Sequence, residues 1–179
     1  TGVIDVSTST PGTYTVTYST AGPCPNTSTV SVTVNAMDDA TFSYASATYC
    51  VNDTDPVATI TGLAGGTFSS AAGLSINAST GTIDVSASTP GAYVVTYTTA
   101  GSCPNSSTAN ITVIALDDAS FSYASAAYCA DATDPTPTVT GLTGGAFTST
   151  AGLLINAGTG EVDVSASTPG AYVITYTTA

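Results

Sequence analysis

Basic residues are missing from this chain: its 179 residues include 12 aspartate and glutamate residues but no lysine, arginine or histidine. The formal net charge at pH 7 is therefore −12. Proteins hold nucleic acids and anionic lipid surfaces through basic side chains, and both of these partners repel an acidic chain. We therefore expect no nucleic-acid partner and no direct contact with a membrane.

Catalytic groups are scarce for the same reason. Without histidine or lysine, no side chain is available as the base for a serine or threonine nucleophile. A pair of carboxylates can cleave a glycosidic bond, but Glu161 is replaced by Thr82 and Val3 at the equivalent positions of the repeat described below. We predict that the chain is not an enzyme and holds no cofactor, with calcium as the one candidate ligand.

The chain also has no initiator methionine, no signal peptide and no apolar run long enough to span a membrane. We expect it to be a window cut from a longer chain. Only 7% of its residues are charged, whereas 42% are hydrophobic, so its composition is that of a folded protein and not of a disordered one.

One segment occurs three times: DVSTSTPGTYTVTY at 5–18 returns with small changes at 84–97 and 163–176, a constant interval of 79 residues. An interval of this size suits a small domain better than a solenoid repeat. The motifs AMDDA and ALDDA interrupt the strand pattern and place boundaries near Met37 and Leu116. The sequence predicts beads on a string: the end of one module at 1–36, a complete module at 37–115, and a module lacking its last strand at 116–179.

Within the module, valine, isoleucine, threonine and tyrosine alternate with period two, and glycine, proline and asparagine separate the runs. About seven short strands of this kind predict an all-β fold of tandem immunoglobulin-like β-sandwich modules. Pro90-Gly91 is a turn dipeptide, and Tyr93 after it is expected to hydrogen bond back to the backbone as a tyrosine corner. The predicted core is Phe42, Tyr44, Ile60, Phe68, Leu74, Ile76, Ile83, Val85, Tyr93, Val95, Tyr97, Ile111 and Val113.

The features Cys50 before a strand, Gly65-Gly66, Pro90-Gly91-x-Tyr93 and Cys103 after the next strand give the unit a familiar pattern. The whole unit resembles the tandem Ig-like or PKD-like repeats of giant cell-surface adhesins of Bacteroidetes, the gliding-motility adhesins among them. The resemblance implies export to the cell surface by the type IX route and attachment through a C-terminal region. It carries no catalytic residues.

The four cysteines recur at fixed positions of the repeat, without zinc-binding spacing, so we expect disulfides and an oxidising, extracellular setting. Pairing within a module joins Cys50 to Cys103 and leaves Cys24 and Cys129 to partners outside the window. Pairing between neighbours joins Cys24 to Cys50 and Cys103 to Cys129. A disulfide needs Cα atoms within about 7 Å, and Cys24 is expected to lie a module length from the next junction, so we favour Cys50–Cys103. This pairing requires the first strand to be short or to cross over early; a lateral contact between chains is the other source of a partner.

Aspartates gather at the inferred junctions and in the NDTDP and DATDP loops. Calcium prefers several oxygen ligands, and an ion at a junction would stiffen a string of modules. Aspartate is also a common turn former, so the alternative is that these residues are solvated turn and linker residues. The candidate calcium ligands are Asp38, Asp39, Asp53, Asp55, Asp117, Asp118, Asp131 and Asp134.

The function that fits these features is a spacer stalk in a giant extracellular bacterial adhesin, closed by disulfides and located at the cell surface. Its partners are neighbouring modules of the same chain, with surface polysaccharide or other copies of the chain as further candidates. The first alternative is a subunit of an extracellular filament or sheath. The second is a carbohydrate-binding module of a secreted enzyme, which the absence of tryptophan disfavours.

Overall fold

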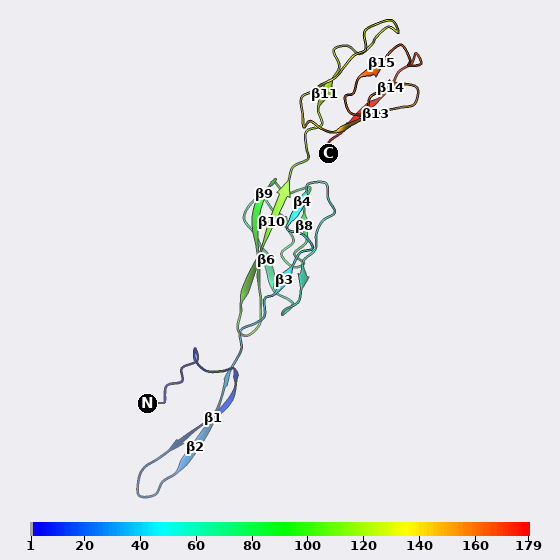
Figure 1. Cartoon of the computed structure of the whole chain (residues 1–179). Helices are drawn as coiled ribbons and strands as arrows, with labels where there is room; N and C mark the ends of the chain where they lie inside the picture. Colours follow the sequence, from blue (N-terminus) through cyan, green and yellow to red (C-terminus); the bar gives the residue numbers. More distant parts are fainter. Residues whose placement is uncertain (1) are drawn as a thin grey trace. The chain divides into compact units, whose positions relative to one another are not determined.

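A computed structural model describes residues 2–179, and within them every regular element is a strand. This confirms the predicted all-β class. The chain divides into two compact units, Thr1–Ala115 and Leu116–Ala179 (Figure 1). The described residues include no helix long and apolar enough to cross a membrane.

The first two strands form a separate antiparallel hairpin. They are β1 (Gly12–Ser19) and β2 (Thr27–Val34), paired from Gly12 with Val34 to Ser19 with Thr27. Threonine or serine alternates with valine or tyrosine over 13–18 and 29–34, so one face carries mainly valine and tyrosine and the other carries threonine and serine. Apolar side chains of this hairpin remain in solvent: the exposed fraction is 69% for Tyr18 and 59% for Val30.

Residues 37–115, the range for which the sequence predicts a complete module and which we call the complete module below, form a two-layer sandwich. One layer is a four-stranded sheet in the order β4-β10-β9-β6, in which β4 runs parallel to β10 and the other pairs are antiparallel. The other layer consists of two short antiparallel pairs, β3 with β5 and β7 with β8. The strands are β3 (Phe42–Ser43), β4 (Thr48–Cys50), β5 (Thr59–Ile60), β6 (Thr67–Ser69), β7 (Ser75–Ile76), β8 (Ile83–Asp84), β9 (Gly91–Thr98) and β10 (Ser106–Ile114).

The core of this module lies between the two layers. Along β9 and β10 the buried residues alternate with exposed ones, as the period-two pattern predicts. All thirteen predicted core residues belong to the observed core cluster, and the structure adds Ala40, Tyr49, Val51 and Ala58. Val51 and Ala58 lie between β4 and β5, Ala40 precedes β3, and Tyr49 stands in the three-residue strand β4, so none of the four belongs to a run long enough for a strand period to mark its inward side.

The unit Leu116–Ala179 repeats this packing with three two-stranded sheets: β11 with β12, β13 with β16, and β14 with β15. Its aromatic core has nearly the same spacing as that of the complete module: the ring centroids of Phe121 and Phe147 are 5.4 Å apart, as are those of Phe42 and Phe68. The strands are β11 (Phe121–Ser122), β12 (Thr138–Val139), β13 (Ala146–Ser149), β14 (Leu154–Ile155), β15 (Val162–Asp163) and β16 (Ile174–Thr177).

The repeated STPG-x-Y motif forms a tyrosine corner in all three copies, as predicted. The Tyr93 hydroxyl donates to the carbonyl oxygen of Thr89 at 2.6 Å, and Tyr14 donates to Thr10 O at 2.7 Å. Tyr172 makes the same bond to Thr168. The bond ties the start of a long strand to the turn that precedes it, so the motif repeats because every copy needs this corner.

Candidate functional site

The complete module holds its incoming chain by a cluster of hydrogen bonds, which we call the entry clamp: Asp38, Thr99, Cys103 and Asn105. The Asp38 backbone N–H donates to Cys103 O at 2.9 Å. The Thr99 hydroxyl donates to Asp38 Oδ2 at 3.0 Å, and Asn105 Nδ2 donates to Asp38 O at 3.0 Å. Three groups of one loop therefore fix a single linker residue against the module.

The loop sequence TAGSCPN explains how the clamp forms. Thr99 is buried, with 3% of its surface exposed, and its hydroxyl also accepts from the Asn105 N–H, which closes the loop. Gly101 lets the carboxylate approach, because a Cβ built there would lie 2.5 Å from Asp38 Oδ2. No local pattern marks Thr99 and Asn105 as partners of Asp38, although TAGPCPN at 20–26 shows that the loop sequence repeats.

The next residue, Asp39, organises the following strand. Its Oδ1 accepts from the Thr41 N–H at 2.9 Å and from the Thr41 hydroxyl, and its carbonyl accepts from the Leu63 N–H at 2.7 Å. The hydroxyl of Thr41 and then its N–H lower the pKa of the Asp39 carboxyl. Asp118 makes the same pair of bonds to Ser120, and its pKa is lowered for the same reason.

The chain leaves the module at the other end of β10. There the parallel strand β4 is bonded alongside: the Val51 N–H donates to Ile114 O at 3.0 Å, and the Thr112 N–H donates to Ala47 O at 2.8 Å. The entry clamp lies at the Ser106 end of β10, because loop 99–105 leads directly into that strand. Entry and exit are therefore separated by the length of β10, and the chain runs through the module from end to end.

The aspartates proposed as calcium ligands serve mainly as acceptors for nearby backbone N–H groups. Asp53 Oδ2 accepts from the Cys50 N–H at 2.7 Å, and Asp55 Oδ1 accepts from the Val85 N–H at 3.1 Å. Asp134 repeats the second bond with Val164 at 3.0 Å. In the described part of the chain, no three acidic or cysteine side chains gather in a way that would hold a metal ion.

The cysteines lie at opposite ends of the complete module. Cys50 is paired with Ile114 at the exit end of β10, whereas Cys103 precedes Ser106 at the entry end. The eight steps from Ser106 to Ile114 span about 26 Å, which is far beyond the roughly 7 Å that a disulfide allows between Cα atoms. All four cysteines are free thiols in the structure. The predicted Cys50–Cys103 pairing does not fit this placement. The chain does cross from one layer to the other between β3 and β4, as that pairing required, but β4 ends at the exit end of the module, away from Cys103.

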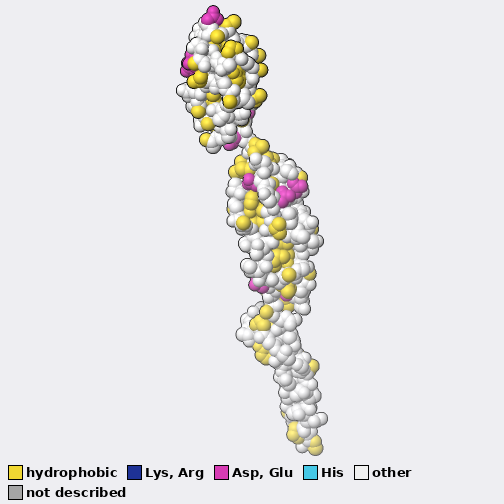
Figure 2. Space-filling model, turned by 90° about the vertical axis from the view of Figure 1, so that its right-hand side faces the viewer, with side chains coloured by type: hydrophobic (Ala, Val, Ile, Leu, Met, Phe, Trp, Pro, Cys, Tyr) yellow, Lys and Arg dark blue, Asp and Glu magenta, His cyan; other side chains and the backbone are white. Residues whose placement is uncertain are grey.

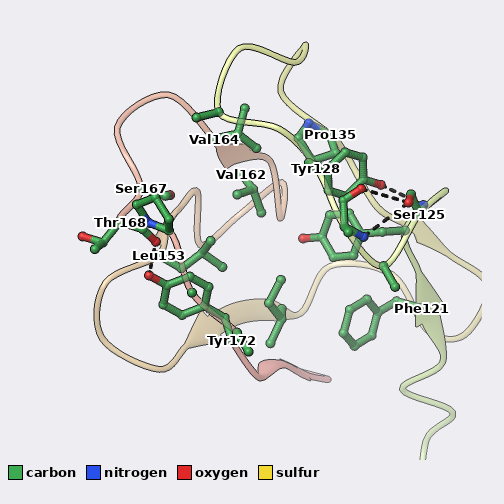
Figure 3. A pocket seen from close by; sticks show the side chains of 18 residues that line it. Phe121, Ser125, Tyr128, Pro135, Leu153, Val162, Val164, Ser167, Thr168 and Tyr172 are labelled. Carbon is green, nitrogen blue, oxygen red and sulfur yellow. Dashed lines mark hydrogen bonds between the residues drawn. The ribbon is translucent and has the colours of Figure 1, made fainter.

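The unit Leu116–Ala179 contains a hollow of about 600 Å³. Figure 3 shows Phe121, Tyr128, Val162 and Tyr172 around it. None of its lining residues carries a charge. The lining is mainly aromatic, aliphatic and small, so this hollow suits an apolar occupant.

The outer surface carries its charge in a few separate places. Figure 2 shows the acidic side chains as small clusters on a surface that is mostly neither charged nor hydrophobic. Several of these carboxylates, such as Asp84 with Ser86 and Ala87, are engaged in turns of their own chain. The hydrogen bond from the Ala87 N–H, followed by that from Ser86, lowers the pKa of Asp84.

No protein-family profile and no curated protein matches this chain. Among solved structures it is similar to "Protocadherin Gamma B2 extracellular cadherin domains 3-6", with 14% identity, a TM-score of 0.39, and coverage of 84% of this chain and 50% of that one. For the "Protocadherin gammaB7 EC3-6 cis-dimer structure" the identity is 16% and the TM-score 0.38, with coverage of 90% of this chain and 52% of that one. For mouse Cadherin-23 EC22-24 the identity is 14% and the TM-score 0.36, with coverage of 89% of this chain and 65% of that one. The chain therefore spans about half the length of the first two, and TM-scores this low support no conclusion about function.

Proposed function

We propose that this chain is a load-bearing spacer segment of an extracellular adhesive protein. The observation that carries the proposal is the parallel pairing of β4 with β10, combined with entry and exit of the chain at opposite ends of β10. The protein acts mechanically: it holds other parts of a larger molecule at a distance and resists being pulled apart.

Tension along the chain loads this pairing in shear. A pull on the linker at Asp38 draws β4 toward the entry end, while a pull beyond Ile114 draws β10 toward the exit end. The bonds Val51 N–H to Ile114 O and Thr112 N–H to Ala47 O then carry the load together. A hairpin pulled apart from its open end loses its bonds one at a time, so a sheared pair resists a greater force.

The surface chemistry supports a spacer in an extracellular setting. The chain has no basic residues, only 7% charged residues and many serine and threonine side chains, so it offers no cation to the carboxylates of surrounding proteins, and copies of it repel one another weakly. Its exposed hydroxyls leave surface polysaccharide as a weak partner. Location at the surface of a gliding bacterium, as the sequence resemblance implies, belongs to this proposal.

Single-molecule force spectroscopy tests the mechanical role on the full chain held by its two ends. Val51→Pro removes the N–H that bonds to Ile114 O, so we expect the unfolding force of the complete module to fall. The control is Tyr93→Phe, which removes the tyrosine corner from the same module but leaves the β4–β10 pairing intact.

Both variants are expected to melt at a lower temperature than the native chain, but only Val51→Pro should unfold at a clearly lower force. The unfolding force depends on the height of the unfolding barrier, whereas the melting temperature reflects equilibrium stability, so comparing the two distinguishes a mechanical effect from a general loss of stability. Equal losses of force in the two variants would contradict the load-bearing role of β4 and β10.

A further inference from the structure

Acidic side chains are divided unevenly over the complete module. The outward-pointing side chains of its four-stranded sheet, on β4, β6, β9 and β10, form one surface, which we call the neutral face. None of these four strands contains an acidic residue. The aspartates of residues 37–115 lie in the incoming linker, in the loop between β4 and β5, and in β8 of the other layer: Asp38, Asp39, Asp53, Asp55 and Asp84. The neutral face is therefore free of the like charge that the rest of the module carries.

The neutral face consists mainly of threonine and serine. Along β9 and β10 one set of side chains is buried in the core, and the alternate set points outward. In the middle of the face, Val94 lies opposite Asn110 and Thr96 lies opposite Thr108. Val94 and Ile114 are the large apolar side chains on this face, with 51% and 44% of their surface exposed. The face thus offers methyl groups together with hydroxyl groups, and no carboxylate.

The hydroxyl groups of the neutral face are available to a partner. In the part of the chain that the structure describes, the side chains of Thr96 and Thr108 make no hydrogen bond. Hydroxyls around β8 in the other layer are already engaged, since Ser86 donates to Asp84 Oδ1 at 2.8 Å and Ser88 donates to Asp84 O at 2.7 Å. A threonine hydroxyl can both donate and accept a hydrogen bond. A face of such groups is therefore complementary to a second copy of itself.

Two other partners fit this face less well. A carbohydrate needs an aromatic surface to stack on, but the aromatic side chains of these strands point into the core, where Phe68 and Tyr97 are buried. A basic protein would find no carboxylate on the face to pair with. A second copy of the chain meets neither difficulty. Contact between two neutral faces also leaves the aspartates of both modules outside the contact.

The size of the neutral face sets the strength of such a contact. The nine residues of β10 make the face about 26 Å long, and four neighbouring strands make it about 19 Å wide. It can therefore bury at most about 500 Å² on each copy, or about 1,000 Å² in all, which is at the lower limit for a specific interface. We expect an association of this size to be weak and reversible.

We propose that the neutral face of the complete module is a self-association surface, through which two copies of this chain pack sheet against sheet. The strands of the two sheets lie within about 30° of each other, and the sheets are about 10 Å apart. A two-fold axis relates the copies, so each contributes the same residues. The proposal does not depend on the spacer function, because it follows from the distribution of charge over one module.

Repulsion between the copies opposes this contact and gives it a characteristic salt dependence. Each copy carries a net charge of −12, and none of the carboxylates of the module lies inside the contact. Added salt screens the repulsion, with a Debye length of about 10 Å at 0.1 M and about 3 Å at 1 M. Association should therefore strengthen as NaCl is raised from about 0.02 M to about 0.5 M, whereas a contact held by ion pairs would weaken over this range.

Sedimentation velocity of the full chain, from micromolar to millimolar concentration in about 0.5 M NaCl, measures the association. We expect dimers at the upper end of this range. Thr108→Asp places a carboxylate in the middle of the neutral face and should weaken dimerisation at least about tenfold. The matched control is Thr59→Asp, which adds the same charge at an exposed strand position of the other layer and should dimerise as the native chain does. Equal weakening by both variants would overturn the proposal.

The second experiment uses the native sequence and needs no variant to fold. Amide NMR spectra of the full chain are recorded as its concentration rises, and the signals of β6, β9 and β10 should shift while those of β5 and β8 stay constant. Shifts confined to the other layer, or a chain that stays monomeric at millimolar concentration in either salt, would contradict the proposal. So would a monomer whose β9 and β10 signals shift only when dextran is added, since that result would identify a neutral polysaccharide as the partner.

Discussion

Gly66 and Tyr97 approach each other so closely that the Gly66 N–H donates to the Tyr97 hydroxyl oxygen at 2.9 Å. The same hydroxyl donates to Leu63 O at 2.7 Å. Tyr97 is fully buried, and a Cβ at position 66 would lie 2.1 Å from Thr98 O. One phenol therefore satisfies two backbone groups of the loop that reverses the chain before β6, and glycine is required for it to do so.

Tyr97→Phe should lower the free energy of unfolding of the complete module by about 1–3 kcal/mol, because it leaves the buried Gly66 N–H and the part-buried Leu63 carbonyl without this partner. Urea unfolding followed by circular dichroism measures the change. Tyr18→Phe is the control: Tyr18 occupies the same position of the repeat in β1, is 69% exposed, and should tolerate the change. Equal effects in both variants would show that the two buried bonds contribute nothing.

Gly101→Ala should destabilise the complete module by about 1–2 kcal/mol, because the new Cβ meets the Asp38 carboxylate at 2.5 Å and disturbs the entry clamp. At the equivalent position of the hairpin, Gly22 has nothing within 4 Å, so Gly22→Ala should be neutral or slightly stabilising. Thermal melts of the two variants provide the comparison.

The clamp explanation predicts coupling between these two residues. Asp38→Ala alone removes the bond from Thr99, but Gly101→Ala added to it should cost much less than Gly101→Ala alone, since the clash has gone. Additive losses in the double variant would show that Gly101 matters for its backbone and not for its approach to Asp38.

Alkaline pH should destabilise the complete module through Tyr44, whose hydroxyl donates to Gly81 O at 2.5 Å. Burial, with a smaller contribution from Tyr49, raises the pKa of Tyr44 from 10.0 to about 12. Because the folded pKa is the higher one, the stabilisation is complete below pH 10 and is lost as the pH rises from 10 towards 12.

Urea unfolding at pH 9 and at pH values between 10 and 12 measures this loss, and the chain has no lysine that would titrate in the same range. In Tyr44→Phe the decline over this range should be smaller than in the native chain, although the variant starts from a lower stability. An identical decline in both would exclude Tyr44 as its source.

Thiol titration should find four reactive thiols in the unfolded chain and no disulfide joining Cys50 to Cys103 after oxidation of the folded chain. The reason is the length of β10, which holds these residues at opposite ends. Peptide mapping of the oxidised protein by mass spectrometry gives the answer directly. A Cys50–Cys103 peptide in good yield from monomeric, folded protein would contradict the strand arrangement.

Calcium should not stabilise the chain more than magnesium does at the same concentration. Both ions screen the net charge of −12, but the described residues present no group of three ligands to either. Melting temperatures in the two salts test this. A saturable stabilisation specific to calcium that disappears in Asp39→Asn would show that Asp39 is a calcium ligand as well as the acceptor for Thr41.

The core and the tyrosine corners could be predicted because each depends on local sequence. Period-two alternation marks the inward side of β9 and β10, and the corner bond spans only four residues from Thr89 to Tyr93. The end of the module at which Cys50 lies could not be predicted in this way. It depends on where the first strand changes layer and on its parallel register with β10, which joins residues more than 60 positions apart.

The entry clamp escaped prediction for a related reason. Asp38 and Asn105 lie 67 positions apart, and neither stands in a strand whose period would announce a buried role. The prediction of Asp38 as a calcium ligand rests on the general preference of cations for several oxygen ligands, which acidic side chains near a junction could supply. In the structure the Asp38 carboxylate accepts from the Thr99 hydroxyl, and the Asp38 carbonyl accepts from the Asn105 amide. Hydroxyl and amide donors are so common in this sequence that their presence does not identify these two residues as the partners of Asp38.

The end-to-end path of the chain through the module has a consequence for reach. Folded, the distance from one end of β10 to the other is about 26 Å; unravelled, the 79 residues of one period can extend to about 280 Å. Unfolding one module therefore adds a length of roughly ten times its folded height. A stalk built from such units would lengthen under a sudden force by unfolding one unit at a time, before any covalent attachment carried the full force.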